Sequence, residues 1–133
     1  MSSIDNALRL EVPCDVDAPG TVRKTLAAAH DGGWALEDGL LVASELVTNA
    51  VRHSGCMGEH ILKVEVLRRH GHLMISVHDP GLSGDTVKPA EPEPADPGGR
   101  GLKIIELLSL RWGSERPDGY RVWAELAAWT PDR

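Results

Sequence analysis

Residues 60–79 contain two stretches in which apolar and polar residues alternate, joined by a short turn. The first is HILKVEVLRRH (60–70), the second is HLMISVHD (72–79), and HGH (70–72) links them. Alternation with a period of two is typical of a half-buried strand, and two such strands joined so closely form an antiparallel hairpin. A second strand pair follows at 111–126, on either side of a PDG turn. We therefore expect a sheet built largely from hairpins.

The other periodic segments predict one further strand and three helices. Residues 7–12 (ALRLEV) alternate like a strand, and a proline follows them. Apolar residues at helical spacing predict helices over 18–30, over 35–55 and from Leu102 to about Ser109. The longest of the three has one broad apolar face, made of Leu36, Leu40, Ala43, Val47, Ala50 and Val51.

The element order is β, α, α, β, β, long loop, α, β, β. Strands in hairpins, without regular alternation with helices, predict an α+β fold: a two-layer α/β sandwich with helices on one face of a mixed, mostly antiparallel sheet. The long loop, PGLSGDTVKPAEPEPADPGGRG (80–101), is rich in Pro, Gly and acidic residues and has no periodicity. Loops of this length within a compact domain are usually functional lids or disordered segments.

Length and composition limit the class of protein. A chain of 133 residues suits one domain, so we expect a single domain over 1–133. The net charge is −6, and no basic cluster is longer than Arg68-Arg69, which argues against direct nucleic-acid binding. No apolar run approaches the roughly 20 residues of a membrane span, and the N-terminus does not resemble a signal peptide. We expect a cytoplasmic protein with no membrane partner.

The two cysteines, Cys14 and Cys56, are far apart in the sequence and form no CxxC pair. We interpret them as reduced, partly buried thiols of a cytoplasmic protein, with a disulfide as the alternative.

The helix over 35–55 carries an unusual polar row. Glu45, Asn49 and His53 are four residues apart and so share one side of the helix. The Asn49 carbonyl oxygen would suit a hard cation such as Mg²⁺ beside phosphates, and Glu45 could orient or deprotonate a nucleophile near it. A plain solvated polar face is the alternative.

Two glycine-containing features bracket the long loop. Asp79 ends a strand, where its carboxylate can accept a hydrogen bond from a ligand amine, and Gly81 allows the backbone to approach that ligand; Asp-Pro-Gly is also an ordinary turn. GGRGLKII (98–105) opens a helix, where free backbone N–H groups and the Arg100 charge would favour an anion. A hinge before a helix is the alternative there.

Together and in this order, SELVTNAVRH, DPG at a strand end, a Pro-rich loop and GGRGL resemble the N, G1 and G2 boxes of the Bergerat-fold (GHKL) ATPases. That superfamily includes type II topoisomerases, the heat-shock chaperone ATPase, MutL-type repair proteins and histidine kinases. The chain length and the closing RWG…PDG…VWAEL are most similar to the anti-sigma-factor serine/threonine kinases, specifically short stand-alone ATP-binding regulators of actinobacteria. The resemblance covers roughly residues 7–128.

The resemblance implies ATP and Mg²⁺ as cofactors and assigns roles to residues. Glu45 corresponds to the general base, Asn49 to the Mg²⁺ ligand, and His53 to a position near the nucleotide. Asp79 corresponds to the aspartate that binds the adenine amino group, with Gly81 beside it. The ATP lid corresponds to about 82–98, and the turn that would hold the β- and γ-phosphates corresponds to Gly99, Arg100, Gly101 and Leu102.

The chain departs from the family pattern at three places. The second glycine of the G1 box, Gly84, comes one residue late. A threonine that often contacts the adenine region is missing, and Tyr120 and Arg121 stand there instead. The lid is acidic, with Glu91, Glu93 and Asp96 against the single base Lys88.

The function implied by the resemblance is a protein serine/threonine kinase that regulates transcription. It would phosphorylate an anti-anti-sigma (STAS-type) partner and otherwise bind a sigma factor; a homodimer is open, because the resembled kinases often dimerise. The alternative is a catalytically silent, ATP-gated binding module, which the acidic lid favours and Glu45 disfavours. A detached histidine-kinase catalytic domain ranks lower, since no segment fits a dimerisation helix pair or a phospho-acceptor histidine.

Overall fold

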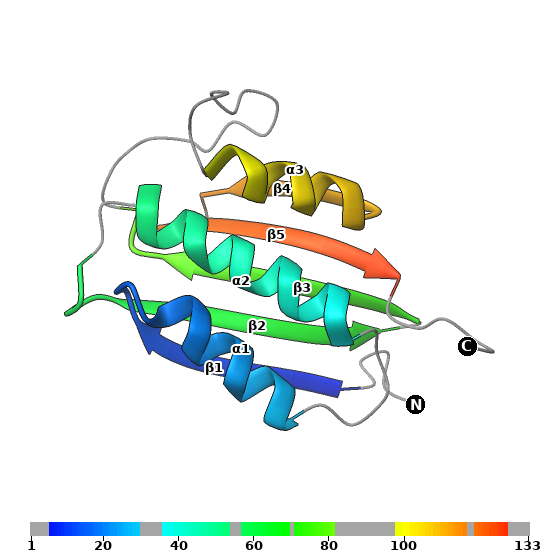
Figure 1. Ribbon diagram of the computed structural model, residues 1–133, viewed down its shortest axis with the longest axis horizontal. Coiled ribbons are helices and arrows are strands. Elements are labelled where there is room, and N and C mark those ends of the chain that lie inside the picture. Colours follow the sequence, from blue (N-terminus) through cyan, green and yellow to red (C-terminus); the bar gives the residue numbers. More distant parts are fainter. Residues whose placement is uncertain are drawn as a thin grey trace.

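The computed structural model describes residues 6–29, 36–53, 57–69, 71–81, 98–116 and 119–127, and within them not the side chains of residues 6, 36, 69 and 98–102. The elements are β1 (Asn6–Pro13), α1 (Ala18–Ala29), α2 (Leu36–His53), β2 (Ile61–Arg69), β3 (His72–Asp79), α3 (Gly98–Leu108), β4 (Arg111–Glu115) and β5 (Tyr120–Ala127). Figure 1 shows two layers, with the three helices on one face of a five-stranded sheet. The predicted α+β sandwich and its element order are confirmed.

The sheet has the strand order β1-β2-β3-β5-β4, and every pairing in it is antiparallel. The expected admixture of parallel pairing is therefore wrong for the described strands. Both predicted hairpins, β2–β3 and β4–β5, are present. The turn between β2 and β3 contains Gly71 with φ of 79°, a left-handed conformation that glycine adopts without steric cost.

The core lies between the helices and the sheet, and α2 is its central helix. Val42, Leu46 and Val47 of α2 have no exposed surface, and they face buried residues of the central strands such as Ile75 and Val77. α2 also packs against α1 on one side and α3 on the other. This amphipathic packing fixes the remaining side of α2, on which the polar row lies.

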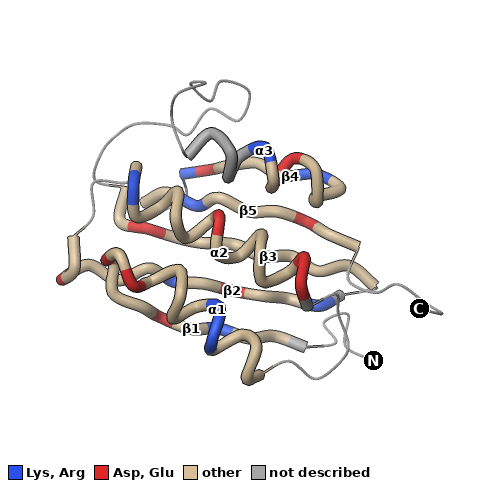
Figure 2. Tube along the Cα trace, viewed as in Figure 1, with Lys and Arg blue, Asp and Glu red and all other residues tan. Residues whose placement is uncertain are grey.

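Charged residues of both signs occur along helices and strands alike (Figure 2). The face of the sheet that is not covered by the helices is polar. Arg9 pairs with Glu65 across β1 and β2, and Arg121 pairs with Glu115 across β5 and β4. A hollow of about 640 Å³ on this face is lined mainly by charged side chains of β1, β2, β3 and β5, and includes none of the predicted site residues.

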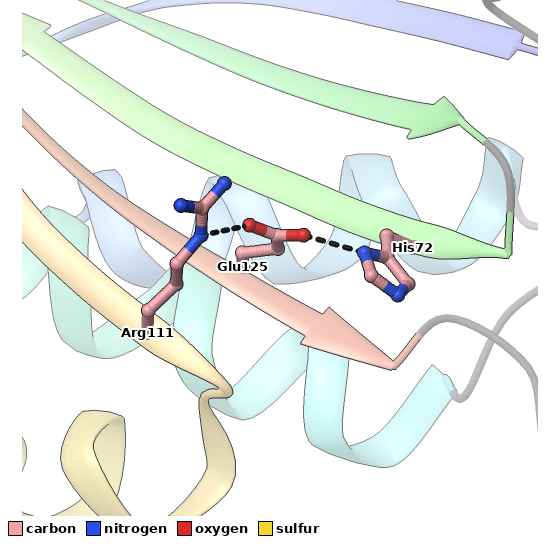
Figure 3. Close-up of polar contacts among 3 residues, drawn as sticks. All are labelled: His72, Arg111 and Glu125. Carbon is pink, nitrogen blue, oxygen red and sulfur yellow. Dashed lines mark hydrogen bonds and ion pairs between the residues drawn. The ribbon is translucent and has the colours of Figure 1, made fainter.

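Glu125 is the one buried carboxylate described on that polar face. Its two oxygens accept hydrogen bonds from Arg111 Nε and His72 Nδ1, each at 2.5 Å, so the carboxylate links β5 to both of its neighbours (Figure 3). The guanidinium of Arg111 also lies 5.9 Å from the ring centroid of Trp123. The hydrogen bond from Arg111, joined by that from His72, lowers the pKa of Glu125 although burial raises it.

Two expectations need correction. The third helix begins at Gly98 and not at Leu102, so the glycine-rich stretch forms the first turn of α3 and does not precede it. Cys14 is buried and disulfide-bonded, not a reduced thiol. Its backbone N–H donates to the carbonyl of His60 at 2.9 Å, so the fold places the end of β1 beside a segment distant in the sequence, which spacing alone does not reveal.

Some expectations fall outside the described residues. These are Cys56 and the lid over 82–97, with its Gly84 and acidic residues; residue 98 of the expected lid begins α3. Within the described residues, no helix is long and apolar enough to cross a membrane.

Candidate functional site

The three features singled out in the sequence lie at one end of the molecule. Because β3 runs antiparallel to β2 and β5, its last residue Asp79 lies where β5 starts. Figure 1 shows that the end of α2 and the start of α3 lie at this same end, on the left of the view. α2 packs against both β3 and α3, so the helix with the polar row borders the other two features.

Asn49 is the most buried polar residue of the polar row, with 1% of its surface exposed. Its amide nitrogen has no hydrogen-bond partner within the described part of the chain. Burying an unpaired amide is costly, so a ligand that satisfies it would be bound with corresponding preference. The amide can donate to a phosphate oxygen or, turned by 180°, coordinate a cation through its carbonyl oxygen. These options fit a nucleotide phosphate with Mg²⁺.

Glu45 and His53 lie one turn to either side of Asn49. Glu45 is half-buried, and burial raises the pKa of its carboxyl group above the ordinary value. A carboxylate with a raised pKa is a better proton acceptor, which suits a general base. His53 is exposed at the last position of α2. Of the three side chains of the polar row, that of His53 is therefore held least firmly by α2.

Asp79 is the second buried polar group of the site, 5% exposed at the end of β3. Its Oδ1 accepts the backbone N–H of Gly81 at 2.6 Å, and Gly81 has φ of 71°. Burial raises the pKa of Asp79, while the Gly81 hydrogen bond and the charges of His78 and Arg116 lower it. With Oδ1 held by the backbone, the second oxygen can accept a hydrogen bond from a ligand amino group.

A second turn packs directly against the Asp79 turn. Gly119, with φ of 105°, precedes β5, and a Cβ built there would lie 2.4 Å from the carbonyl oxygen of Asp79. A Cβ at Gly81 would in turn lie 3.0 Å from Gly119 backbone atoms. The PDG sequence before β5 indicates a turn at Gly119, but nothing in the sequence shows that this turn lies beside residue 79.

Tyr120 and Arg116 also belong to this end of the site. Tyr120 is 4% exposed and is the cross-strand partner of Asp79, so the two side chains leave the sheet on the same, helix-covered face. Arg121 points to the opposite face, where it pairs with Glu115. Of the two residues that replace the expected threonine, Tyr120 is therefore the one beside Asp79. The Arg116 guanidinium lies 4.9 Å from the Tyr120 ring centroid.

The glycine-rich start of α3 forms the third part of the site, beside α2 and the end of β3. Gly99, Arg100, Gly101 and Leu102 lie in the first turn of α3, where backbone N–H groups lack partners within the helix. Together with the helix dipole, such N–H groups favour an anion. The side chains of these residues are outside the described part of the chain, and it is the backbone N–H groups that would bind the anion.

Comparison with known proteins identifies the family. The model of the histidine kinase-like ATPase domain matches residues 15–125, most of the chain. The chain belongs to this family. Membership implies that the histidine kinase-like ATPase domain described here binds ATP, and the Bergerat fold expected from the sequence is confirmed. A search of curated proteins gives no match.

Two solved structures share the fold of this histidine kinase-like ATPase domain. One contains the RsbU and RsbW domains of Rv1364c from Mycobacterium tuberculosis: TM-score 0.66, 20% identity, 96% of this chain and 33% of that chain. The other is the histidine kinase domain of the blue-light activated histidine kinase from Erythrobacter litoralis EL346: TM-score 0.56, 18% identity, 87% of this chain and 61% of that chain. The chain thus spans about a third and three fifths of these two proteins, and at such identities the likeness shows the fold alone.

Proposed function

We propose that this domain is an ATP-dependent protein serine/threonine kinase of the anti-sigma-factor type. ATP would lie between α2, the end of β3 and the first turn of α3. The observation that carries the proposal is the buried, unpaired amide of Asn49, on the helix face that borders both a carboxylate and a helix N-terminus. The family match supports ATP as the ligand.

Each wall of the site would bind one part of the nucleotide. The second oxygen of Asp79 would accept a hydrogen bond from the adenine amino group, and Gly81 would allow close approach of the base. The backbone N–H groups of residues 99–102 would donate to the β- and γ-phosphates. Asn49 would hold Mg²⁺, which when bound supplies charge neutralisation at the phosphates. His53 would lie near the nucleotide.

Glu45 would act as the general base. It would take the proton of a serine or threonine hydroxyl on the partner as that oxygen attacks the γ-phosphorus, and ADP would leave. Because the protein does little covalent chemistry in phosphoryl transfer, most of the acceleration would come from positioning and electrostatics.

The partner proposed is an anti-anti-sigma (STAS-type) protein, released on phosphorylation, with a sigma factor bound in its place. The sequence resemblance to anti-sigma-factor kinases supports this choice, and the fold shared with the structure that includes an RsbW domain agrees with it. A catalytically silent ATP-gated module is the second candidate; the presence of a half-buried Glu45 in the polar row with Asn49 favours the kinase, because a binding module has no use for a base.

Transfer of label from γ-labelled ATP to a candidate partner protein tests the proposal. The wild-type domain should label the partner, and Glu45→Gln should reduce labelling by about a hundredfold or more while ATP affinity stays within about twofold. Glu37→Gln, at an exposed position on the same helix, is the matched control. Equal labelling by Glu45→Gln and wild type would remove Glu45 as the base; ATP binding without labelling of any tested partner by wild type would favour the silent module.

A further inference from the structure

The hollow on the face of the sheet away from the helices has no part in the proposed function. Its volume, about 640 Å³, lies within the range of pockets that bind small molecules. Alternation along the strands directs Lys63, Ser76 and His78 to this face, while the side chains of their neighbours Val64 and Val77 are buried towards the helices. Because most of the side chains that line the hollow are charged, a ligand that fits it carries charge as well.

Ser76, on the middle strand β3, lines the hollow although only 5% of its surface is exposed. Its hydroxyl group makes no hydrogen bond with any residue that the structure describes. A buried hydroxyl without a partner has lost the hydrogen bonds that it makes in water, so a ligand oxygen that accepts from it is favoured. The Ser76 hydroxyl therefore indicates a hydrogen-bond acceptor in the bound ligand.

A row of basic side chains crosses the sheet beside Ser76. Lys63, His78 and Arg121 are directly opposite one another in the register of β2, β3 and β5, and all three line the hollow. Like charges in directly opposite positions of neighbouring strands destabilise a sheet. Arg121 is paired with Glu115, whereas the Lys63 ammonium group has no hydrogen bond or ion pair with a described residue. An anion between these side chains would relieve the repulsion and pair with Lys63.

Two carboxylates also line the hollow, but they do not reverse its sign. Glu65 is already bound by Arg9 Nε, and Glu11 lies on the edge strand β1, on the far side of Lys63 from His78. The three permanently charged basic side chains of the lining outnumber its two carboxylates, in a chain whose net charge is −6. The lining therefore favours an anion, although the molecule as a whole is acidic.

We propose that this hollow is a binding site for a small oxyanion, the phosphate or carboxylate group of a small organic molecule. One oxygen of the ligand would accept the hydrogen bond of the Ser76 hydroxyl, and the others would pair with Lys63 and Arg121. The site lies across the sheet from the proposed nucleotide site, since His78 immediately precedes Asp79 and their side chains leave β3 on opposite faces. The inference does not depend on ATP binding.

Titration of the full chain with inorganic phosphate, and separately with succinate, tests the inference. The titrations are followed through the backbone amide signals in two-dimensional NMR spectra, at constant ionic strength so that general screening does not change. At least one probe should cause saturable shifts of the amides around Lys63, Ser76 and His78. The two probes distinguish a ligand with a phosphate group from one with carboxylate groups.

Substitutions that change the charge of the hollow in opposite directions provide the sharpest test. Lys63→Gln should weaken binding of the probe about two- to fivefold, and Ser76→Ala about threefold or more. Glu11→Gln, which removes the carboxylate opposite Lys63, should strengthen binding about twofold or more. Lys24→Gln, at an exposed position on α1, is the control for a general loss of positive charge and should bind as wild type does.

Four results would overturn the inference. These are the absence of saturable shifts with either probe, shifts confined to α2 and the first turn of α3, equal weakening by Lys24→Gln and Lys63→Gln, and weaker binding by Glu11→Gln. The second result would place the anion at the nucleotide site, and the last would mean that charge does not select the ligand of the hollow. All four leave the proposed ATP site intact.

Discussion

Gly119 and Gly81 bring two backbone turns into direct contact beside Asp79. Gly119→Ala should destabilise the protein by about 2 kcal/mol or more, because its φ of 105° is strained for alanine and the new Cβ would meet the Asp79 carbonyl oxygen. Gly20→Ala is the control: no atom lies near its Cβ position within α1, so it should stabilise by about 0.5–1 kcal/mol. Urea denaturation measures both; equal effects would contradict the described packing.

Asp79 should lower the stability of the folded protein while it contributes to nucleotide binding. Its folded-state pKa is raised above the ordinary value of 3.8, so the buried charge lowers stability at all pH values above that raised pKa. Asp79→Asn should therefore stabilise the protein at neutral pH, by up to about 1 kcal/mol, although it impairs binding of ATP. The gain should disappear as the pH falls below 3.8, where the carboxyl is protonated in both states. Urea denaturation at several pH values checks this; a destabilised variant at neutral pH would contradict it.

At the scale of elements, Glu125 joins the three strands β3, β5 and β4. Glu125→Gln should cost about 1–2 kcal/mol at neutral pH, since the amide keeps only one accepting oxygen and can replace only one of the two hydrogen bonds made by the carboxylate to its partly exposed partners. The folded-state pKa of Glu125 is lowered from 4.5, so its contribution is present above pH 4.5 and is lost as the pH falls through the lower folded-state value.

Glu115→Gln is the matched control for that prediction. Glu115 also pairs with an arginine across two strands, but its side chain is 51% exposed, so the substitution should change stability by less than about 0.5 kcal/mol. The measurement is urea denaturation at pH 7 and at a series of lower pH values below 4.5. Equal costs for the two variants, or a Glu125→Gln cost that does not fall as the pH is lowered below 4.5, would contradict the role given to the buried carboxylate.

Elements with strong periodicity could be predicted from the sequence, and those without it could not. The alternation in 60–79 and the apolar face of 35–55 fixed both hairpin partners and the central helix to within two residues. The sequence places the start of α3 four residues late, because Gly98, Gly99 and Gly101 have poor helix propensity.

The candidate site also contains some residues that could be grouped from the sequence and others that could not. Glu45 and Asn49 could be grouped because four-residue spacing on a helix is geometry. The neighbourhood of Asp79 could not, because Gly119, Tyr120 and Arg116 reach it through strand pairing across β3 and β5, and strand register is not visible in local spacing. For the same reason the sequence offers the disulfide of Cys14 only as the alternative to a reduced thiol.

At the scale of the whole molecule, one core joins all helices to the central strands, so the chain should unfold as a single unit. Urea transitions followed by tryptophan fluorescence, to which Trp112 of β4 and Trp123 of β5 contribute, and by far-ultraviolet circular dichroism should coincide. Leu46→Ala, in the middle of α2, should move both transitions together and cost about 2–5 kcal/mol. Two separated transitions would contradict the single domain proposed over 1–133.

The central proposal for the whole molecule is that α2, β3 and α3 enclose one ATP·Mg²⁺ site around Asn49. The most direct test is calorimetric titration of ATP, with and without Mg²⁺, into wild type, Asn49→Ala and the control Thr48→Ala, whose hydroxyl bonds back to its own helix. Wild type and Thr48→Ala should bind ATP more tightly with Mg²⁺, and Asn49→Ala should lose that gain, by about tenfold or more. Equal affinity of all three proteins with and without Mg²⁺, or no binding by wild type, would contradict it.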